Sequence, residues 1–268
     1  MKNILQIILI TIISLTVISC SSSDDSKTTT TSSVSFVAVG TSGTLLTSSD
    51  GTTWTSRTSG TTNTLYGITY GNSTFVTVGN SGTILTSSDG TTWTSRTSGT
   101  TNDLWGDNYI NSIFVAVGDS GTILTSSDGT SWDNRTSGTS YGLQKVFYSN
   151  SRFTVVGDAG SVLRSSDGIS WDNSTSQTTE NLYGIYYVNS SIVMVGESGT
   201  IITSLNEGID WDNRTSGTTN RLYKVTYGNS TFVTVGLSGT VLTSLDGTTW
   251  TSRTSGTTET LHGIAYKE

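Results

Sequence analysis

The sequence repeats one short motif at an almost constant spacing. The stretch Thr47–Trp54 reads TSSDGTTW, returns unchanged at Thr86–Trp93, and returns in altered form four more times. The tryptophans that end the six copies are 39, 39, 39, 40 and 39 residues apart: Trp54, Trp93, Trp132, Trp171, Trp211 and Trp250. A fixed period of this length is typical of solenoids and β-propellers, so the repeat decides the class of fold before any single residue does.

Each unit holds four short runs rich in β-branched and aromatic residues. In the unit from Leu65 to Asn102 these runs are Leu65–Tyr70, Thr74–Val78, Thr83–Ser87 and Thr92–Thr97. They are separated by Gly-Asn, Asn-Ser-Gly and Asp-Gly sequences, all of which are turn signals, and Asp-Gly is a pair favoured in the primed turns of hairpins. Four antiparallel strands per unit make a propeller blade.

The two ends of the chain complement each other. The first unit begins late, at Ser35, and lacks a counterpart of Leu65–Tyr70, whereas LHGIAY at Leu261–Tyr266 stands alone after the last motif. Pairing of this segment with Phe36–Val39 would complete the first blade and close the ring without free inner edges. An open solenoid would need polar capping repeats instead. We therefore predict an all-β, six-bladed β-propeller of four-stranded antiparallel blades over residues 35–268, closed by C-terminal strand pairing into the first blade.

The motif itself predicts a rigid hairpin. Its aspartate can accept backbone N–H groups inside its own turn, its glycine permits a positive φ, and its indole covers the apolar side of the hairpin. The residues to which we assign this structural role are Asp50, Trp54, Asp89, Trp93, Asp128, Trp132, Asp167, Trp171, Asn206, Trp211, Asp246 and Trp250.

The motif resembles the Asp-box, or bacterial neuraminidase repeat, written S-x-D-x-G-x-x-W. Most copies here lack the residue between Asp and Gly, but SLNEGIDW at Ser204–Trp211 has the full spacing, with Asn206 in place of the aspartate. The whole unit, with its FVAVG-x-x-G-x-I-x-x-S-x-D-G-x-x-W sequence, looks most like the propellers related to photosystem II assembly factors. The resemblance covers everything after the N-terminal tether. It implies a sialidase-like propeller fold but no activity, because Asp-box turns lie on the face opposite a sialidase's active site.

A sialidase would need an arginine cluster, a Tyr/Glu nucleophile pair and an acid/base carboxylate near the ring axis. Five arginines instead occupy the third position after a motif tryptophan, on the outermost strand of successive blades: Arg57, Arg96, Arg135, Arg214 and Arg253. Residues spread around a rim cannot converge on one carboxylate. No catalytic residue is assigned, and with one histidine and one cysteine in the chain no metal and no cofactor are expected.

A single specific site should appear where the repeats differ. The residue after the second-strand glycine is an acid in three neighbouring blades: Asp119, Asp158 and Glu197. The second residue of the inner strand also varies: Tyr66, Trp105, Gln144, Tyr183, Tyr223 and His262. Aromatic rings beside carboxylates suit the stacking of sugars or the docking of a basic peptide. We therefore take the acids and these aromatic residues, with His262, as candidate ligand-binding residues. The alternative is that the rings pack between blades and that the acids are solvated loop residues.

The N-terminus predicts export and anchoring. Residues 1–19 carry one lysine and then an apolar run, as in a signal peptide. Residues 17–20, VISC, resemble the lipobox of bacterial lipoproteins, in which Cys20 becomes the lipidated first residue. The rest of residues 20–34 is rich in Ser, Thr and Asp and predicts a flexible tether. These features favour a lipid-anchored protein of the outer membrane or cell surface, with contact to the membrane through its N-terminal lipid only.

Charge excludes one class of partner. The chain carries a net charge of −7, so nucleic acid is not expected as a partner. Three functions remain: a non-enzymatic, monomeric scaffold or adhesion module that binds a protein at one propeller face, a multivalent lectin with one equivalent site per blade, and a sialidase-like glycoside hydrolase. The hydrolase would need paired carboxylates, for which Asp119, Asp158 and Glu197 are the candidates. We favour the scaffold.

Overall fold

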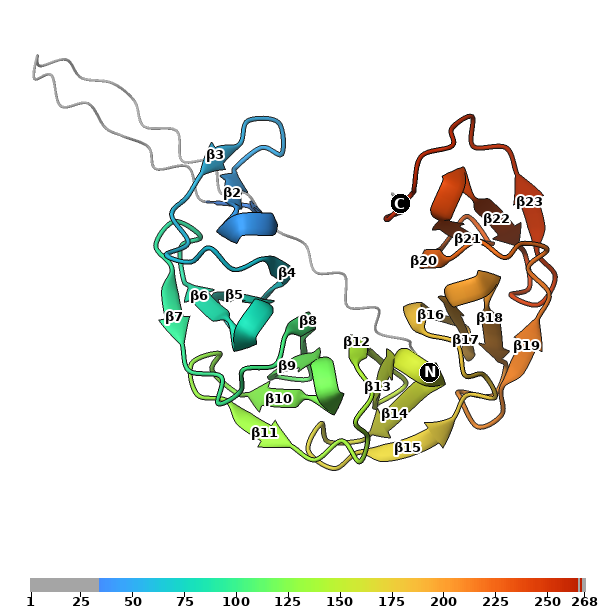
Figure 1. Cartoon of the computed structure of the whole chain (residues 1–268), viewed down its shortest axis with the longest axis horizontal. Helices are drawn as coiled ribbons and strands as arrows, with labels where there is room; N and C mark the ends of the chain where they lie inside the picture. Colours follow the sequence, from blue (N-terminus) through green and yellow to red (C-terminus); the bar gives the residue numbers. More distant parts are fainter. Residues whose placement is uncertain (1–33, 265, 267–268) are drawn as a thin grey trace, which may run out of the picture. The chain divides into compact units, whose positions relative to one another are not determined.

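The computed structural model describes residues 34–264 and residue 266, all of which belong to one compact unit. These residues form six antiparallel sheets, five of four strands and one of three. The sheets follow one another in chain order along an arc, with the first strand of each blade on the inner side and the last on the outer side (Figure 1). The predicted all-β, six-bladed propeller architecture is confirmed. The predicted signal peptide (1–19), Cys20 and the tether up to residue 33 lie outside the described residues.

The blades share one order of elements, in which a single 3-10 turn separates the second and third strands of each four-stranded blade and the first two strands of the three-stranded blade 1. Blade 1 has β1 (Phe36–Val39), η1 (Thr41–Gly43), β2 (Leu45–Ser48) and β3 (Thr55–Ser56). Blade 2 has β4 (Leu65–Gly71), β5 (Thr74–Gly79), η2 (Asn80–Gly82), β6 (Ile84–Ser87) and β7 (Thr94–Arg96). Blade 3 has β8 (Leu104–Ile110), β9 (Ile113–Gly118), η3 (Asp119–Gly121), β10 (Ile123–Ser126) and β11 (Asp133–Arg135).

The other half of the arc repeats the same order. Blade 4 has β12 (Leu143–Ser149), β13 (Arg152–Gly157), η4 (Asp158–Gly160), β14 (Ser161–Ser165) and β15 (Asp172–Thr175). Blade 5 has β16 (Leu182–Val188), β17 (Ser191–Gly196), η5 (Glu197–Gly199), β18 (Ile201–Ser204) and β19 (Asp212–Arg214). Blade 6 has β20 (Leu222–Gly228), β21 (Thr231–Gly236), η6 (Leu237–Gly239), β22 (Val241–Ser244) and β23 (Thr251–Arg253). No helix in the described part of the chain is long and apolar enough to cross a membrane.

Positive backbone angles occur at the predicted turns, including the motif glycine, but the primed turn is in the first hairpin of the blade and not at the Asp-Gly pair. The first hairpin of blade 2 turns at Asn72 and Ser73, both with positive φ (45° and 57°), which is the conformation of a primed two-residue turn. In the Asp89-Gly90 turn only the glycine has positive φ, at 74°. The Asp-Gly pair therefore does not form a primed hairpin turn, because its geometry is set by side-chain hydrogen bonds.

Those hydrogen bonds involve the serine and the aspartate of the motif. In blade 2, Asp89 Oδ1 accepts the backbone N–H groups of Thr91 at 2.7 Å and Thr92 at 2.8 Å, and Ser87 Oγ accepts the N–H of Gly90 at 2.8 Å. The indole Nε1 of Trp93 donates to the carbonyl oxygen of Gly90 at 3.0 Å. The Asp89 contacts lower the pKa of its carboxyl, so the ionised form stabilises the turn.

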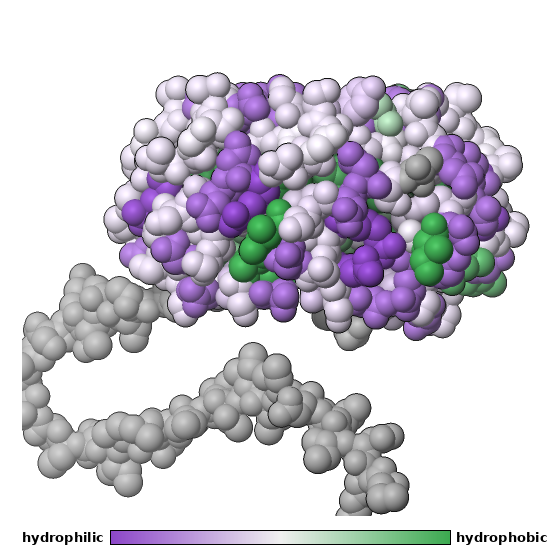
Figure 2. Space-filling model, turned by 90° about the horizontal axis from the view of Figure 1, so that it is seen from below, coloured by the Kyte–Doolittle hydropathy of each residue, from purple (hydrophilic) through white to green (hydrophobic). Residues whose placement is uncertain are grey.

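The apolar core lies between neighbouring blades. One cluster joins Val115, Val117 and Ile123 of blade 3 to Leu143 and other residues of blade 4. Within most blades an inner-strand tyrosine packs on a second-strand phenylalanine, which packs in turn on the motif tryptophan. The centroid distances are 4.5 and 6.3 Å in blade 2, 4.6 and 6.4 Å in blade 3, 4.8 and 6.1 Å in blade 4, and 4.7 and 6.4 Å in blade 6. The face drawn in Figure 2 consists mostly of residues of intermediate hydropathy, with hydrophilic residues between them and a few isolated apolar patches.

Blade 1 is incomplete in the structure. Its sheet contains only β1, β2 and β3, and Leu261–Ile264 belong to no strand. The predicted pairing of the C-terminal segment with Phe36–Val39 is therefore absent from the described residues. The backbone N–H of Leu261 donates to the carbonyl oxygen of Gly236 at 2.9 Å, so this segment lies on blade 6, and the arc of blades does not bring it to β1. The described residues at the end of the chain lie on the blade 6 side of the arc, away from β2 and β3 (Figure 1).

Candidate functional site

A β-bulge places the second residue of each inner strand at one face of the propeller. In blade 4, Leu143 pairs with Gly157 and Lys145 pairs with Val156, so the register shifts around Gln144. The same shift occurs at Tyr66, Trp105, Tyr183 and Tyr223. Bulges re-aim side chains and often lie beside functional sites.

The bulge residue and the first residue of the next 3-10 turn meet because the hairpin brings them to one edge. In blade 5, the Tyr183 hydroxyl donates to Glu197 Oε2 at 2.8 Å. In blade 4, Gln144 Nε2 donates to Asp158 Oδ1 at 3.1 Å. These pairs join the two sets of positions that the sequence singled out. We call the surface formed by Trp105, Gln144, Asp158, Tyr183, Glu197, Arg221, Tyr223 and His262 the aromatic–acid arc.

Arg221 joins blade 5 to blade 6 and was not among the predicted site residues. Its Nη2 lies 2.7 Å from Glu197 Oε2, and its Cζ lies 5.2 Å from the ring centroid of Tyr183 and 5.7 Å from that of Tyr223. The sequence carries a signal for it, because Arg221 is a single-copy residue directly before an inner strand. Thr64, Asp103, Gly142, Asn181 and Thr260 hold that position elsewhere.

Three rings continue the arc into the C-terminal segment. The centroid of Tyr223 lies 6.0 Å from that of Tyr183 and 4.7 Å from that of His262, with tilted planes. Tyr183 and Tyr223 are partly buried, whereas His262 is exposed. Tyr183 and Tyr223 therefore pack between blades while part of each ring faces the solvent.

Trp105 and Asp158 come together across the boundary between blades 3 and 4. A Cβ atom added to Gly142 would lie 2.5 Å from Trp105 Cζ3 and 2.7 Å from Asp158 Oδ2. The absence of a side chain at Gly142 is thus what admits the indole and the carboxylate side by side.

Two predicted residues stand apart from the arc. Asp119 is exposed, and its Oδ1 accepts the N–H of Ser120 at 2.7 Å within its own turn. Tyr66 is 47% exposed and lies near the incomplete blade. Whether any of the candidate residues binds a ligand stays a prediction.

The charges in the arc are fixed by its hydrogen bonds. Partial burial raises the pKa of Glu197, but the hydrogen bonds from Arg221 and Tyr183 outweigh it and leave that pKa below its usual value. The hydrogen bond to Glu197 raises the pKa of Arg221. Burial raises the pKa of Tyr183. Glu197 is therefore a carboxylate at neutral pH.

The rim arginines are held by their own blades. The Nε of Arg96 donates to Thr86 Oγ1 at 2.8 Å, and Arg253 does the same to Thr243 at 2.8 Å. In blade 3, Arg135 adds an ion pair with Asp133 at 2.9 Å. These arginines do not converge on one point, as the sequence predicted.

A further charged group lies on the inner strands. Asp107 is packed against Gly67 of the preceding blade, where an added Cβ would lie 2.2 Å from Asp107 Oδ1, and Asp107 Oδ2 is buried without a hydrogen-bond partner. Burial raises the pKa of Asp107 to about 7, against a weaker opposing effect of Lys145. Burial likewise lowers the pKa of Lys145. Asp107 thus lies at a blade junction.

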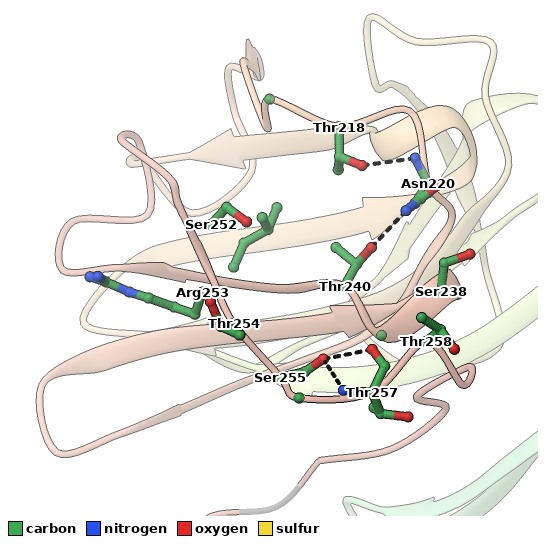
Figure 3. A pocket seen from close by; sticks show the side chains of 14 residues that line it. Thr218, Asn220, Ser238, Thr240, Ser252, Arg253, Thr254, Ser255, Thr257 and Thr258 are labelled. Atoms are coloured by element: carbon green, nitrogen blue, oxygen red, sulfur yellow. Dashed lines mark hydrogen bonds between the residues drawn. The ribbon is translucent and has the colours of Figure 1, made fainter.

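Three equivalent grooves lie on the blades, each lined by the repeated Ser, Thr, Gly and Asn residues. Their volumes are about 770, 590 and 740 Å³ in blades 2, 3 and 6. In the blade 6 groove, Asn220 Nδ2 donates to Thr240 Oγ1 at 2.9 Å, and hydroxyl groups surround the space while Arg253 extends away from them (Figure 3). We call these the repeat grooves.

Among the described residues, no group of three or more His, Cys, Asp or Glu side chains lies close enough to hold a metal ion. The fold and the arc together define a six-bladed β-propeller whose one face carries cross-blade aromatic and charged contacts.

Comparison with solved structures identifies propellers of the same fold. The chain is similar to a structure described as YCF48 bound to D1 peptide, with a TM-score of 0.65 and 19% identity over 81% of this chain and 76% of that one. It is also similar to YCF48 from Cyanidioschyzon merolae, with a TM-score of 0.65 and 17% identity over 84% of this chain and 82% of that one. No family model matches the chain, and no curated protein matches it. At these identities the likeness concerns the fold.

Proposed function

We propose that the protein is a non-enzymatic scaffold that binds an extended, cationic protein segment along the aromatic–acid arc. The observation that carries this proposal is the continuous set of contacts from Glu197 through Arg221, Tyr183 and Tyr223 to His262, which crosses two blade boundaries. A peptide lying across blades can stack its side chains on the rings and place its cations beside Glu197 and Asp158.

The chemistry of the partner follows from charge. The chain has a net charge of −7, and the arc holds two carboxylates, one of them already paired with Arg221. A cationic segment suits this field better than an anionic one. The similar propeller YCF48 is described with a bound D1 peptide, which supports a peptide as the class of ligand here.

We further propose that Cys20 carries a lipid anchor and that residues 20–34 hold the propeller away from an outer membrane. The lipobox-like sequence and the tether composition support this address. Labelling of intact cells with a membrane-impermeant reagent, compared between the wild-type chain and Cys20→Ser, tests it. Loss of the surface signal in the variant is expected, and an unchanged signal would contradict the anchor.

The binding proposal is tested with short labelled peptides of three kinds: lysine-rich, glutamate-rich and uncharged. Fluorescence anisotropy should show binding of the lysine-rich peptide that weakens about tenfold in Glu197→Gln and in Tyr223→Ala. Tyr66→Ala is the matched control, because Tyr66 holds the same bulge position outside the arc. Equal affinity for all three peptides, or equal losses in all three variants, would overturn the proposal.

A multivalent lectin is the second candidate, and the repeat grooves favour it. Equivalent hydroxyl- and amide-lined grooves in blades 2, 3 and 6 would offer several sites per chain and hence avidity. A glycan array followed by calorimetry discriminates the two functions. Several equivalent sites per chain would establish the lectin, whereas one peptide site and no glycan binding would leave the scaffold.

A further inference from the structure

Blade 1 exposes aromatic side chains that the other blades cover. Phe36 is 49% exposed and Trp54 is 41% exposed, and their ring centroids lie 6.5 Å apart as in a complete blade. In blade 2 the counterpart of Phe36 is Phe75, which is covered by Tyr70 at 4.5 Å. No such tyrosine packs on Phe36 among the described residues, because β1 has no inner-strand neighbour.

The C-terminal segment carries the missing tyrosine. Tyr266 is 50% exposed and holds the position in LHGIAY that Tyr70 holds in LYGITY. By the register of blade 2, in which Tyr70 pairs with Phe75 and Ile68 with Thr77, Tyr266 matches Phe36 and Ile264 matches Ala38. Tyr70 is itself 56% exposed although it stacks on Phe75, so the exposed rings that mark the missing stack are those of Phe36 and Trp54. The tyrosine that would cover them lies at the other end of the chain.

The C-terminal segment contacts blade 6 in the same way as the inner strand of each blade contacts the blade before it. Leu261 N–H donates to the Gly236 carbonyl at 2.9 Å, just as Leu65 N–H donates to the Gly40 carbonyl at 3.0 Å. Tyr266 lies against Gly228, where an added Cβ would be 2.0 Å from its ring, and Tyr109 lies against Gly71 in the same way, at 1.9 Å. The segment therefore forms a further blade junction that lacks strands two to four.

Blade 1 of the same chain does not supply those strands in this structure. Its strands and the C-terminal segment lie at opposite ends of the arc (Figure 1). To close the ring within one chain, the junctions between neighbouring blades would all have to bend. These junctions are tightly packed, as Tyr109 against Gly71 shows, and tight packing resists such bending. A second copy can bring its own blade 1 to the segment without deforming any junction, and it would continue an interface that the chain already repeats.

We propose that Leu261–Tyr266 of one copy adds to the free edge of β1 in a second copy, completing its first blade. The interaction is antiparallel strand addition, with Tyr266 covering Phe36 and Trp54 of the neighbouring copy. Because the two surfaces differ, the contact is head to tail. This assembly replaces the monomer expected from the sequence.

Cysteines placed separately in two chains test the contact. In a Cys20→Ser background, one full-length chain carries Ala38→Cys and the other carries Ile264→Cys, since directly opposed residues of antiparallel strands lie within reach of a disulfide. Mixing and mild oxidation should give a disulfide-linked species of two different chains. A chain with Ser95→Cys, on the exposed β7, replaces the Ala38→Cys chain as the matched control and should not link to Ile264→Cys.

Two results would overturn the proposal. One is an internal disulfide at the mass of a single chain in the double variant Ala38→Cys/Ile264→Cys, without linkage between mixed chains. The other is no linkage in either experiment. Sedimentation of the unmodified chain provides a second measurement: masses of two or more chains should dissociate about tenfold more readily in Tyr266→Ala. Tyr70→Ala, the same position within a complete blade, should leave the mass unchanged.

Discussion

Arg221 and Glu197 form an ion pair of 2.7 Å across the boundary between blades 5 and 6. The pair sits in the centre of the aromatic–acid arc, and both side chains are partly exposed, at 40% and 30%. The pair fixes the positions of the two charged side chains on the arc but adds little to the free energy of unfolding, because exposed ion pairs contribute little free energy.

Arg221→Ala should raise the pKa of Glu197 while changing the free energy of unfolding by less than about 1 kcal/mol. The hydrogen bond from Arg221 lowers this pKa and burial raises it, so removing the arginine leaves the raising effect. Because the pKa of Glu197 is lower in the folded than in the unfolded chain, the ionised carboxylate adds a little stability at pH values above its pKa in the unfolded chain. This small contribution is lost in the variant. Titration of the Glu197 carboxyl by NMR measures the shift, and an unchanged pKa would contradict the assigned ion pair.

Asp89→Ala should cost about 1 kcal/mol of stability, because it removes the acceptor for the N–H groups of Thr91 and Thr92. Asp89→Asn should cost less, since Asn206 fills the same role in blade 5 and its Oδ1 accepts the N–H of Asp210 at 2.9 Å. Urea unfolding measures both. Thr92→Ala is the control, because it keeps the backbone donor. Equal losses in Ala and Asn variants would show that the side-chain acceptor is not what matters.

Trp250→Ala should destabilise the protein more than Trp54→Ala. Trp250 is 9% exposed and packs on Phe232 in a complete blade, so its removal should cost about 3 kcal/mol or more. Trp54 is 41% exposed and should cost about 1 kcal/mol in a single chain, because little of its surface is buried. Unfolding at low protein concentration makes the comparison. Equal costs would mean that Trp54 is already covered.

The sequence predicted the blades well because their information is local. Alternating runs and turn residues define each hairpin, and the observed β4 and β5 end within one residue of the predicted runs. The motif aspartate was correctly predicted to accept backbone N–H groups within its own turn, and the motif glycine has a positive φ as predicted. The primed geometry predicted from the Asp-Gly pair was wrong, because the side-chain hydrogen bonds of Ser87 and Asp89 fix a different turn.

Contacts between blades were harder to predict. The carboxylates and rings of the arc were chosen from variation between repeats, but Arg221 and the space at Gly142 depend on which blade faces which. Closure of the ring was inferred from matching ends, and the sequence carries no information on how far each junction turns. The fifth motif, which has one extra residue, shows the same limit. In the other motifs the tryptophan Nε1 donates to the carbonyl oxygen of the motif glycine, as in Trp93 and Gly90. In the fifth motif Trp211 Nε1 is buried without a partner, and the carbonyl oxygen of Gly208 accepts a hydrogen bond from Arg164 at 3.0 Å instead.

Asp107→Asn should stabilise the protein at neutral pH and flatten its stability between pH 4 and 7. Burial raises the pKa of Asp107 from 3.8 to about 7, so the folded state binds a proton that the unfolded state has released. Stability therefore falls as the pH rises from 3.8 to about 7 and is not recovered above that value. Lys145 is the charged group that faces Asp107, and its attraction only partly offsets the burial.

The gain for Asp107→Asn above neutral pH should be about 2 kcal/mol, roughly half of what the pKa shift corresponds to, because the side chain is only partly buried. Urea unfolding across the pH range measures it, with the exposed Asp172→Asn as control. If wild type and Asp107→Asn keep parallel pH profiles, the carboxyl is ionised throughout. In that case Asp107 is solvated at the junction between β4 and β8, not buried there.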